Sequence, residues 1–190
     1  MTRFVLAAVF CAFVLGSMPA GAQETPTPAP ANPNTTAYND PAMSFTAAPG
    51  FRYLGGRPYD PLSSEPTVVA AFVSNPGEQD AHLVQIQIEF YEGGLSGYET
   101  LATDELRGHL NNALVSKKQQ TTLSNGMPAL WEEISIGEGF QEMKRWQYEW
   151  VDGQRGVILS DSGRYGGITE EQAKAELANV SAVDYPRNRI

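Results

Sequence analysis

The stretch RWQYEWVDGQRGVILS, residues 145–160, decides the fold. Apolar and polar side chains alternate on both sides of Asp152-Gly153, a dipeptide that favours a tight hairpin turn. With these two residues at the centre of a type I′ turn, Trp150 faces Arg155 across the hairpin. One face then carries Trp146, Tyr148, Trp150, Arg155, Val157 and Leu159, and the other carries Arg145, Gln147 and Glu149 opposite Ser160, Ile158 and Gly156.

This hairpin has two interpretations. In the first, the aromatic face is packed inside a sheet, where aromatic–aliphatic pairs across neighbouring strands stabilise by roughly 0.2–1 kcal/mol each. In the second, Trp150 and Arg155 form an exposed cation–π lip near the turn, on which a ligand can stack. Trp150 and Arg155 are therefore the candidate ligand-binding residues.

Four strands are predicted upstream of the hairpin, over residues 44–46, 51–54, 66–74 and 82–91. The segment 66–74 is apolar and β-branched, as in a buried strand. The segment 82–91 alternates apolar with polar residues and should bury one face: the apolar positions are Val84, Ile86, Ile88 and Phe90, and the polar ones Gln85, Gln87 and Glu89.

Two helices are predicted on either side of a meander. Ser96 and Glu99 have the spacing of a capping box, and leucines at 106, 110 and 114 recur at helical spacing, which predicts a helix over 96–117. A turn at 124–127 leads into a strand over 128–136. Thr169 and Gln172 form a second capping box, for a helix to about residue 178.

These elements predict an α+β fold, with a mostly antiparallel sheet flanked by helices in one domain over residues 43–184. A C-terminal tail follows at 185–190. Ahead of the domain, residues 23–42 are rich in Pro, Thr and Asn and should form a disordered arm.

The first residues predict export. The apolar run from Phe4 to Gly16 follows Arg3 and is too short to span a bilayer. Ala20 and Ala22 form the small-residue pattern of a cleavage site, so residues 1–22 should be a signal peptide. The mature protein is then periplasmic or extracellular, without stable insertion in the membrane.

Charge and cysteine content exclude several classes of function. The formal net charge of the 190 residues is −9, which disfavours nucleic acid as a partner. The single cysteine, Cys11, lies in the signal peptide, so the mature chain has neither a disulfide nor a thiol nucleophile.

Two motifs resemble catalytic ones. Asp161-Ser162-Gly163 matches the triplet of aspartic proteases, but those enzymes need two such aspartates and this sequence has one copy. Residues 94–98, GLSGY, fall short of the serine-hydrolase motif G-x-S-x-G, and Ser96 is already assigned to a helix cap. We therefore expect a strand end and a helix start at these places. No phosphate-binding loop or dinucleotide motif is present in the sequence.

The carboxylates and histidines give no site by spacing. Glu132 and Glu133 are adjacent in a strand and point to opposite faces. Glu132, Glu138, Glu142 and Asp152 are interpreted as a solvated acidic edge. The two histidines, His82 and His109, are isolated, so no metal and no cofactor is predicted, although a cross-strand site of histidine and carboxylates stays open.

The order of elements resembles one known family. Residues 125–131, NGMPALW, are similar to the "x-G-x-P-A" step of PsbP/DcrB-like domains, and the strands, capped helix, aromatic hairpin and closing helix follow in the same order over about 43–184. The resemblance implies an exported or lumenal protein with an antiparallel sheet between helices. It also implies an accessory, adaptor or binding role, with no catalytic residues to transfer.

The leading hypothesis is therefore an exported, soluble, non-enzymatic binding or accessory protein of the cell envelope, with a protein or a small ligand as partner. The alternative is an envelope hydrolase with a site of scattered carboxylates, possibly acting on glycans, because paired carboxylates and aromatic platforms serve that chemistry. A third hypothesis is an assembly partner tethered by the Pro-rich arm.

Overall fold

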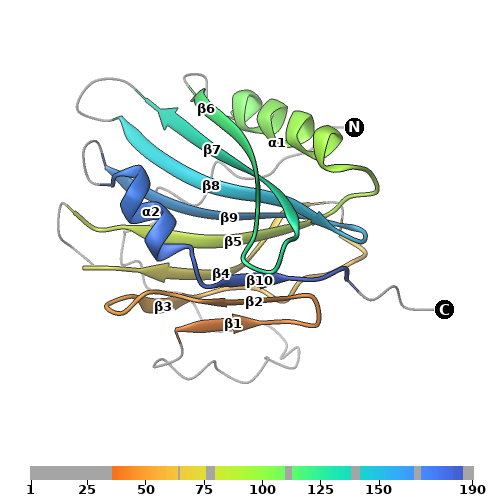
Figure 1. The fold of residues 1–190 in the computed structure, drawn as a ribbon, viewed down its shortest axis with the longest axis horizontal. Coiled ribbons are helices and arrows are strands. Elements are labelled where there is room, and N and C mark those ends of the chain that lie inside the picture. Colours follow the sequence, from red (N-terminus) through yellow and green to blue (C-terminus); the bar gives the residue numbers. More distant parts are fainter. Residues whose placement is uncertain are drawn as a thin grey trace, which may run out of the picture.

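The structure, a computed structural model, describes residues 36–63, 65–75, 80–109, 113–137, 142–164 and 168–185. The predicted signal peptide, most of the predicted arm and most of the predicted tail lie outside these residues. The elements in chain order are β1 (Ala37–Asn39), β2 (Met43–Thr46), β3 (Arg52–Gly55), β4 (Thr67–Val73), β5 (Leu83–Phe90), α1 (Leu95–His109), β6 (Ala113–Thr122), β7 (Pro128–Ile136), β8 (Met143–Asp152), β9 (Arg155–Arg164), α2 (Glu170–Glu176) and β10 (Val180–Ala182) (Figure 1).

The strands form two antiparallel sheets. The larger sheet has seven strands in the order β3-β4-β5-β9-β8-β7-β6, and the smaller has three in the order β1-β2-β10. Every neighbouring pair in both sheets is antiparallel. This arrangement confirms the predicted α+β class and the mostly antiparallel sheet.

The main hydrophobic core lies on one face of the large sheet. Strands β5, β8 and β9 contribute apolar residues to it, and the small sheet and α2 cover them with Phe45, Leu177 and Val180. The predicted capping box of α2 is confirmed, because Thr169 accepts from the amide of Gln172, whose side chain accepts from the Thr169 amide. The predicted turn at 124–127 is also present, and Ser124 donates to the carbonyl of Val180 at 2.5 Å.

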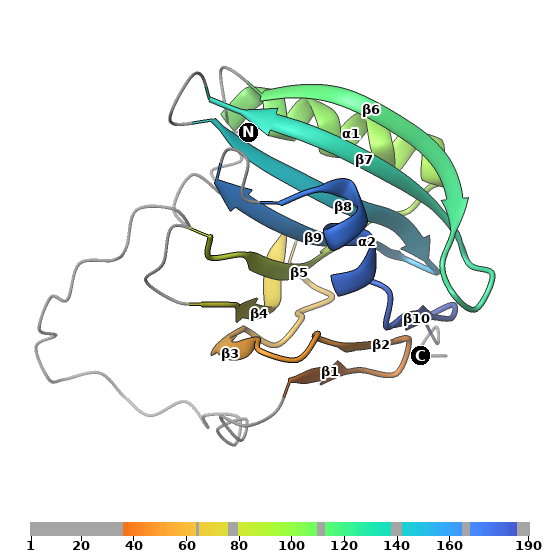
Figure 2. The ribbon, with the colours of Figure 1, turned by 60° about the vertical axis from the view of Figure 1, so that its left-hand side comes forward.

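Helix α1 lies on the opposite face of the large sheet. Figure 2 shows α1 behind β6 and β7, and α2 in front of the sheet. Tyr98 and Ala102 of α1 pack with Ile158 of β9 in a second, smaller apolar cluster. No helix among the described residues has both the length and the apolar composition that crossing a membrane requires.

The predicted C-terminal end of the first helix, beyond His109, is wrong. The helix ends at His109, and residues 113–122 form the edge strand β6, which pairs with β7. Leu114 lies on this strand and is largely exposed, so its spacing from Leu106 does not mark a helix face. An edge strand exposed on both sides shows no apolar alternation, and its Lys117-Lys118 pair is typical of edges protected from pairing with other chains.

The N-terminal boundary of the domain also differs from the prediction. Residues 37–39 were assigned to the disordered arm, but they form β1 and pair with β2. Asp40 fixes the turn between the two strands, because its Oδ1 accepts from the amides of Ala42 and Met43 at 2.7 and 2.8 Å. The domain continues past the closing helix into β10, a strand that the sequence analysis did not predict.

The hairpin of β8 and β9 forms with a register two residues away from the predicted one. Asp152 pairs with Arg155 and Trp150 with Val157, so Gly153 and Gln154 make the turn. Gly153 has φ 65°, the conformation that the first central residue of a type II′ turn needs. A shift by two residues preserves the faces, so the six side chains predicted to share one face still do.

Candidate functional site

Beneath α1, the large sheet carries a row of polar side chains. Cross-strand pairing aligns Gln85 of β5, Ser160 of β9, Gln147 of β8, Glu132 of β7 and Lys118 of β6. Side chains that are directly opposite one another on neighbouring strands share one face and contact each other. The first four are buried, whereas Lys118 on the edge strand is exposed. The row therefore runs from the middle of the sheet to its edge.

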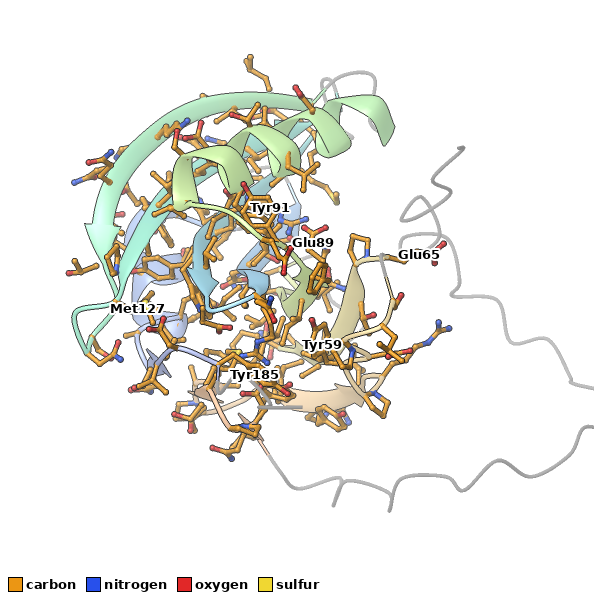
Figure 3. All side chains as sticks on the ribbon, turned by 90° about the vertical axis from the view of Figure 1, so that its right-hand side faces the viewer. Tyr59, Glu65, Glu89, Tyr91, Met127 and Tyr185 are labelled. Atoms are coloured by element: carbon orange, nitrogen blue, oxygen red, sulfur yellow. The ribbon has the colours of Figure 1, made fainter. Side chains whose placement is uncertain are left out.

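The burial of this row corrects a prediction. Gln85, Gln87 and Glu89 of β5 were expected to face solvent, but all three are buried under the α1 side of the sheet. Figure 3 shows Glu89 on that side, below Tyr91, whose ring packs against Tyr98 of α1 at a centroid distance of 5.1 Å. The alternation in the sequence is real, but α1 covers the polar face.

Glycine at position 156 allows α1 to lie close to the sheet. A Cβ atom added to Gly156 would stand 2.0 Å from the ring of Tyr98. The Tyr98 ring therefore rests directly on the β9 backbone, next to Ile158. This contact holds the first half of the helix against the polar face.

Glu132 and Glu149 form a buried carboxyl pair on this face, and each is only 1% exposed. The Nε2 atom of Gln147 donates to Glu149 Oε1 at 2.5 Å and to Glu132 Oε2 at 3.4 Å. Burial raises the pKa of Glu149 well above its usual range, and the carboxyl of Glu132 raises it further. Burial also raises the pKa of Glu132. The pair therefore keeps a proton at pH values where an exposed glutamate has lost it.

Several polar atoms around the pair accept or donate no hydrogen bond among the described residues. They are Glu132 Oε1, Gln147 Oε1, Glu149 Oε2, Arg145 Nε and Ser160 Oγ. Buried polar atoms in folded proteins nearly always have a partner, because leaving one without costs about 1–3 kcal/mol. The described residues therefore leave part of the hydrogen-bonding capacity of this buried face unused.

A cleft of about 390 Å³ gives access to the polar face. One wall comes from α1 (Glu99, Thr100, Thr103 and Asp104), the other from β6 (residues 115–118), and Glu132 is the lining residue from β7. Lys118 forms an ion pair with Glu99 across the two walls. Lys117 forms one with Glu170 of α2 at 2.5 Å. Both lysines of the cleft are thus neutralised by carboxylates.

The predicted ligand-binding residues, Trp150 and Arg155, form no exposed lip. Trp150 is 0% exposed and Arg155 is 1% exposed, and the register pairs them with Val157 and Asp152 rather than with each other. The aromatic face of the hairpin belongs to the main core. The first interpretation of the hairpin, a packed sheet face, fits these positions.

Arg155 is the centre of a structural ion-pair cluster. Its Nε donates to Asp152 Oδ1 at 2.7 Å, and its Nη1 donates to Asp40 Oδ2 at 2.8 Å. Burial works to raise the pKa of Asp40, but Arg155 and backbone amides outweigh it and hold that pKa below its usual value. The guanidinium also lies 4.2 Å from the ring of Tyr185, and Figure 3 shows Tyr185 beside Tyr59. The cluster joins the β1–β2 turn to the hairpin and orders a residue assigned to the tail.

Of the four carboxylates interpreted as a solvated acidic edge, the three that the structure describes do not lie together. Glu132 is buried on the α1 side, and Asp152 is buried on the opposite face with Arg155. Glu142 precedes β8, at the other end of that strand from Asp152. Glu138 lies outside the described residues.

The two catalytic-like motifs take ordinary positions, with two differences from the prediction. Ser96 lies inside α1, which begins at Leu95, so it is not the residue that caps the helix. Glu99, its predicted partner, pairs with Lys118 instead. Asp161, Ser162 and Gly163 all lie within β9, which continues to Arg164 rather than ending there. His109 is the last residue of α1.

The sequence analysis missed Glu149 as the partner of Glu132. The two residues lie on adjacent strands and are separated by a loop, so no local spacing marks the pair. The available signal was the alternation of side chains along β7 and β8. When these strands pair, the alternation places Glu132, Gln147 and Glu149 on one face of the sheet. The alternation does not reveal that a helix covers that face.

Comparison with known proteins identifies the fold. No model of a known protein family matches the sequence, and no curated protein is significantly similar to it. Among solved structures, the cyanobacterial PsbP protein (CyanoP) of Synechocystis sp. PCC 6803 superposes with a TM-score of 0.55, over 88% of this chain and 98% of that one, at 10% sequence identity. The chain has the PsbP-like fold. The resemblance found in the sequence is thereby confirmed at the level of the fold.

Two other structures are less similar. A protein of Bacteroides thetaiotaomicron gives a TM-score of 0.45 at 13% identity, over 80% of this chain and 51% of that one. A protein of unknown function from Pseudomonas aeruginosa, PA94, described as a putative regulator, gives 0.42 at 9% identity, over 70% of this chain and 84% of that one.

Proposed function

We propose that the protein is an exported, non-enzymatic binding or accessory protein of the cell envelope, and that its ligand occupies the cleft between α1 and β6. The observation that carries this proposal is the position of Glu132. Its carboxyl group is buried, lines the cleft, and among the described residues is hydrogen-bonded only to Gln147 and to the carboxyl of Glu149. A ligand in the cleft can supply a further donor.

The charges of the cleft indicate a small cationic ligand with hydrogen-bond donors. Lys117 and Lys118 are each paired with a glutamate. Within the described part of the chain, no ion pair of Asp104 or Glu132 is found, so the remaining charge of the lining is negative. An ammonium group close to Glu132 would favour the ionised form of the carboxyl and offset the cost of its burial.

The predicted signal peptide supports export, and the PsbP-like fold is compatible with an accessory role. The proposal that export ends in the periplasm or outside the cell rests on residues 1–22 alone. No nucleic-acid partner is proposed, because the chain is acidic.

The alternative, a hydrolase acting on glycans, is favoured by one observation: the pKa of a buried carboxyl in the pair is raised, as in a general acid. The geometry of the pair does not suit this reaction. Catalytic carboxyls flank the scissile bond, at about 5–5.5 or 6.5–9.5 Å from each other. Here Gln147 bridges the two groups, and Glu132 but not Glu149 lines the cleft.

A calorimetric titration with matched variants tests the proposal. The probes are 1,4-diaminobutane, as a small dication, and a chitin tetrasaccharide, as a neutral glycan. The variants are Glu132→Gln and, as control, Glu133→Gln, which removes a carboxylate from the neighbouring residue on the opposite face. We expect the diamine to bind the wild type and the control, and to bind Glu132→Gln at least about tenfold more weakly, a loss of about 1.4 kcal/mol.

Other results would reject the proposal. Equal diamine affinity in both variants, or no binding to the wild type, would remove the cleft as the binding site. Release of shorter sugars from the tetrasaccharide that depends on Glu132 and Glu149 would establish the hydrolase instead.

A further inference from the structure

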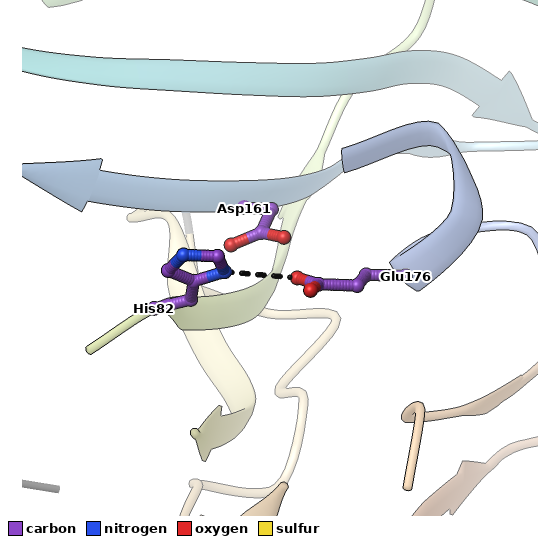
Figure 4. A group of neighbouring side chains, drawn as sticks. All are labelled: His82, Asp161 and Glu176. Atoms are coloured by element: carbon purple, nitrogen blue, oxygen red, sulfur yellow. Dashed lines mark hydrogen bonds and ion pairs between the residues drawn. The ribbon is translucent and has the colours of Figure 1, made fainter. Parts of the chain in front are cut away.

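On the face of the sheet opposite the cleft, three potential metal ligands from distant parts of the chain meet. They are His82, which directly precedes β5, Asp161 of β9 and Glu176, the last residue of α2 (Figure 4). One ligand atom from each lies within 4.8 Å of the others. His82 Nδ1 lies 3.2 Å from Glu176 Oε2. Figure 4 shows the Asp161 carboxyl pointing into the space between the other two side chains.

Asp161 is the unusual member of the cluster. It is 0% exposed, and among the described residues the backbone amide of Ser162 is the one donor that favours its ionised form. Its side chain lies against the carboxyl group of Glu176. Two carboxylates in contact in a buried place repel each other unless a proton or a metal cation lies between them. Either a proton or a metal cation between Asp161 and Glu176 would relieve this repulsion.

The backbone holds the three side chains in fixed places. Asp161 lies mid-sheet, paired with Val84 on one side and Trp146 on the other. The backbone of His82 exchanges two hydrogen bonds with Ser74: the His82 amide donates to Ser74 Oγ, and the Ser74 amide donates to the His82 carbonyl, both at 3.0 Å. Leu177, directly after Glu176, is buried in the main core and anchors the end of α2.

We propose that His82, Asp161 and Glu176 bind a divalent transition-metal ion, with Zn²⁺ as the best match. One imidazole nitrogen and two carboxylate oxygens are ligands that zinc accepts, at about 2.0–2.2 Å from the ion. Tetrahedral ligand atoms at that distance are about 3.3 Å apart. His82 Nδ1 and Glu176 Oε2 are 3.2 Å apart, and all three ligand atoms lie within 4.8 Å of one another, which is close to the separations that a tetrahedral ion requires.

The surroundings leave a route for the ion and for a fourth ligand. The Glu176 side chain is 20% exposed, whereas that of His82 is 8% exposed. The ion can therefore enter past Glu176, and water can complete the tetrahedron from that side. Because Glu176 belongs to α2 and the other two ligands to the sheet, a bound ion would join the helix to the sheet.

This site is independent of the cleft. Asp161 and Glu132 point to opposite faces of the large sheet, since Asp161 pairs with Trp146 and Glu132 pairs with Gln147. A failure of zinc binding would leave the proposed function of the cleft unaffected, and the reverse also holds.

The test is a zinc titration of the full-chain protein, purified without a histidine tag and stripped of metal with a chelator. Calorimetry measures affinity and stoichiometry, and thermal unfolding measures the rise in Tm that zinc causes. The variants are Asp161→Asn and Glu176→Gln. The matched controls are Glu171→Gln, an exposed carboxylate on the same helix, and His109→Gln, the other histidine of the chain.

We expect one zinc ion per chain in the wild type and in both controls. Each ligand variant should bind zinc at least about 100-fold more weakly, since the loss of even an outer partner of a metal ligand costs about 10–100-fold. Zinc should raise the Tm of the wild type and the controls, and not that of Glu176→Gln. Glu176 is partly exposed at a helix end, so its variant should fold even if Asp161→Asn does not.

Two results would overturn the proposal. One is a wild type that binds no zinc above non-specific levels. The other is a zinc affinity that Glu176→Gln leaves unchanged, or that His109→Gln reduces by the same factor. As a second readout, Co²⁺ in place of Zn²⁺ should give the visible absorption bands of a tetrahedral ion in the wild type, and these should disappear in Glu176→Gln.

Discussion

Replacing Glu149 with glutamine should make the domain more stable at neutral pH. Burial raises the pKa of Glu149 well above its usual range in the folded state, whereas the unfolded chain ionises it normally. Between those two pKa values the folded state binds a proton that the unfolded state does not. The free energy of unfolding therefore falls as pH rises through this window, by up to about 1.4 kcal/mol per pH unit for one proton. At pH values below the unfolded pKa of about 4.3 both states are protonated, and this loss is absent.

Glu149→Gln removes that dependence. Glutamine has nearly the same shape, needs no proton, and its amide can donate to Glu132, which favours the ionised form of that carboxyl. Near pH 4 the free energy of unfolding of the variant should equal that of the wild type or be slightly lower. For each pH unit above that value, the variant should lose about 1.4 kcal/mol less of this free energy than the wild type, until the pH reaches the folded-state pKa of the pair.

Urea denaturation at half-unit steps from pH 4 to pH 8 measures this difference. Glu133→Gln serves as the control, because it removes a carboxylate from the opposite face of β7 and leaves the pair in place. Parallel curves for wild type and Glu149→Gln, over the whole range, would refute the reasoning. A variant that becomes less stable than the wild type as pH rises would refute it too.

Three further predictions concern the scaffold and the export of the chain. Arg155→Met leaves the carboxylates of Asp40 and Asp152 without their buried partner, and should lower the free energy of unfolding by about 3–5 kcal/mol in a urea titration. A loss below about 1 kcal/mol would contradict the structural role of the cluster. Gly156→Ala places a methyl group into the ring of Tyr98 and should cost about 1–3 kcal/mol, while the near-UV circular dichroism of the aromatic residues changes; an unchanged spectrum and stability would show that α1 does not rest there. Expressed in a bacterium with its own N-terminus, the protein should be recovered from the periplasm or the medium, cleaved after Ala22; an intact mass of the uncleaved chain would reject the signal peptide.

The alternation of side chains along strands was the most reliable information in the sequence about which residues share a face of the sheet. The register of the aromatic hairpin differs from the predicted one by two residues, yet the same side chains share a face because the period of a strand is two. The turn moved because closing the strands at Asp152 and Arg155 forms their buried ion pair, and because Gly153 takes the positive φ there. Sequence alone cannot weigh such a long-range ion pair against a favourable dipeptide.

Local capping signals were reliable in one helix and misleading in the other. The box at Thr169 and Gln172 is present in the structure, but the one at Ser96 and Glu99 is not, because α1 starts before Ser96. The end of α1 was misplaced because leucine spacing continues across the boundary into β6. The strand assignment there depends on pairing with β7, which no local pattern encodes.

The candidate sites were beyond prediction from one sequence for a physical reason. The polar residues of β5, β7 and β8 read as a solvent face, since polar side chains are usually exposed. They are buried because α1 covers them, and the helix itself shows no sign of that role in its spacing. His82, Asp161 and Glu176 come from three separate segments, and only the packing of α2 on the sheet brings them together.

The central claim is that a ligand binds in the cleft beside Glu132. The place where the ligand binds can be measured directly. Amide chemical shifts of the isotope-labelled protein, followed by NMR during titration with 1,4-diaminobutane, report which residues respond. We predict that the largest changes fall on α1 between Glu99 and Asp104 and on β6 between Val115 and Lys118, and that they disappear in Glu132→Gln. Changes confined to other surfaces, or equal changes in Glu132→Gln, would contradict the account.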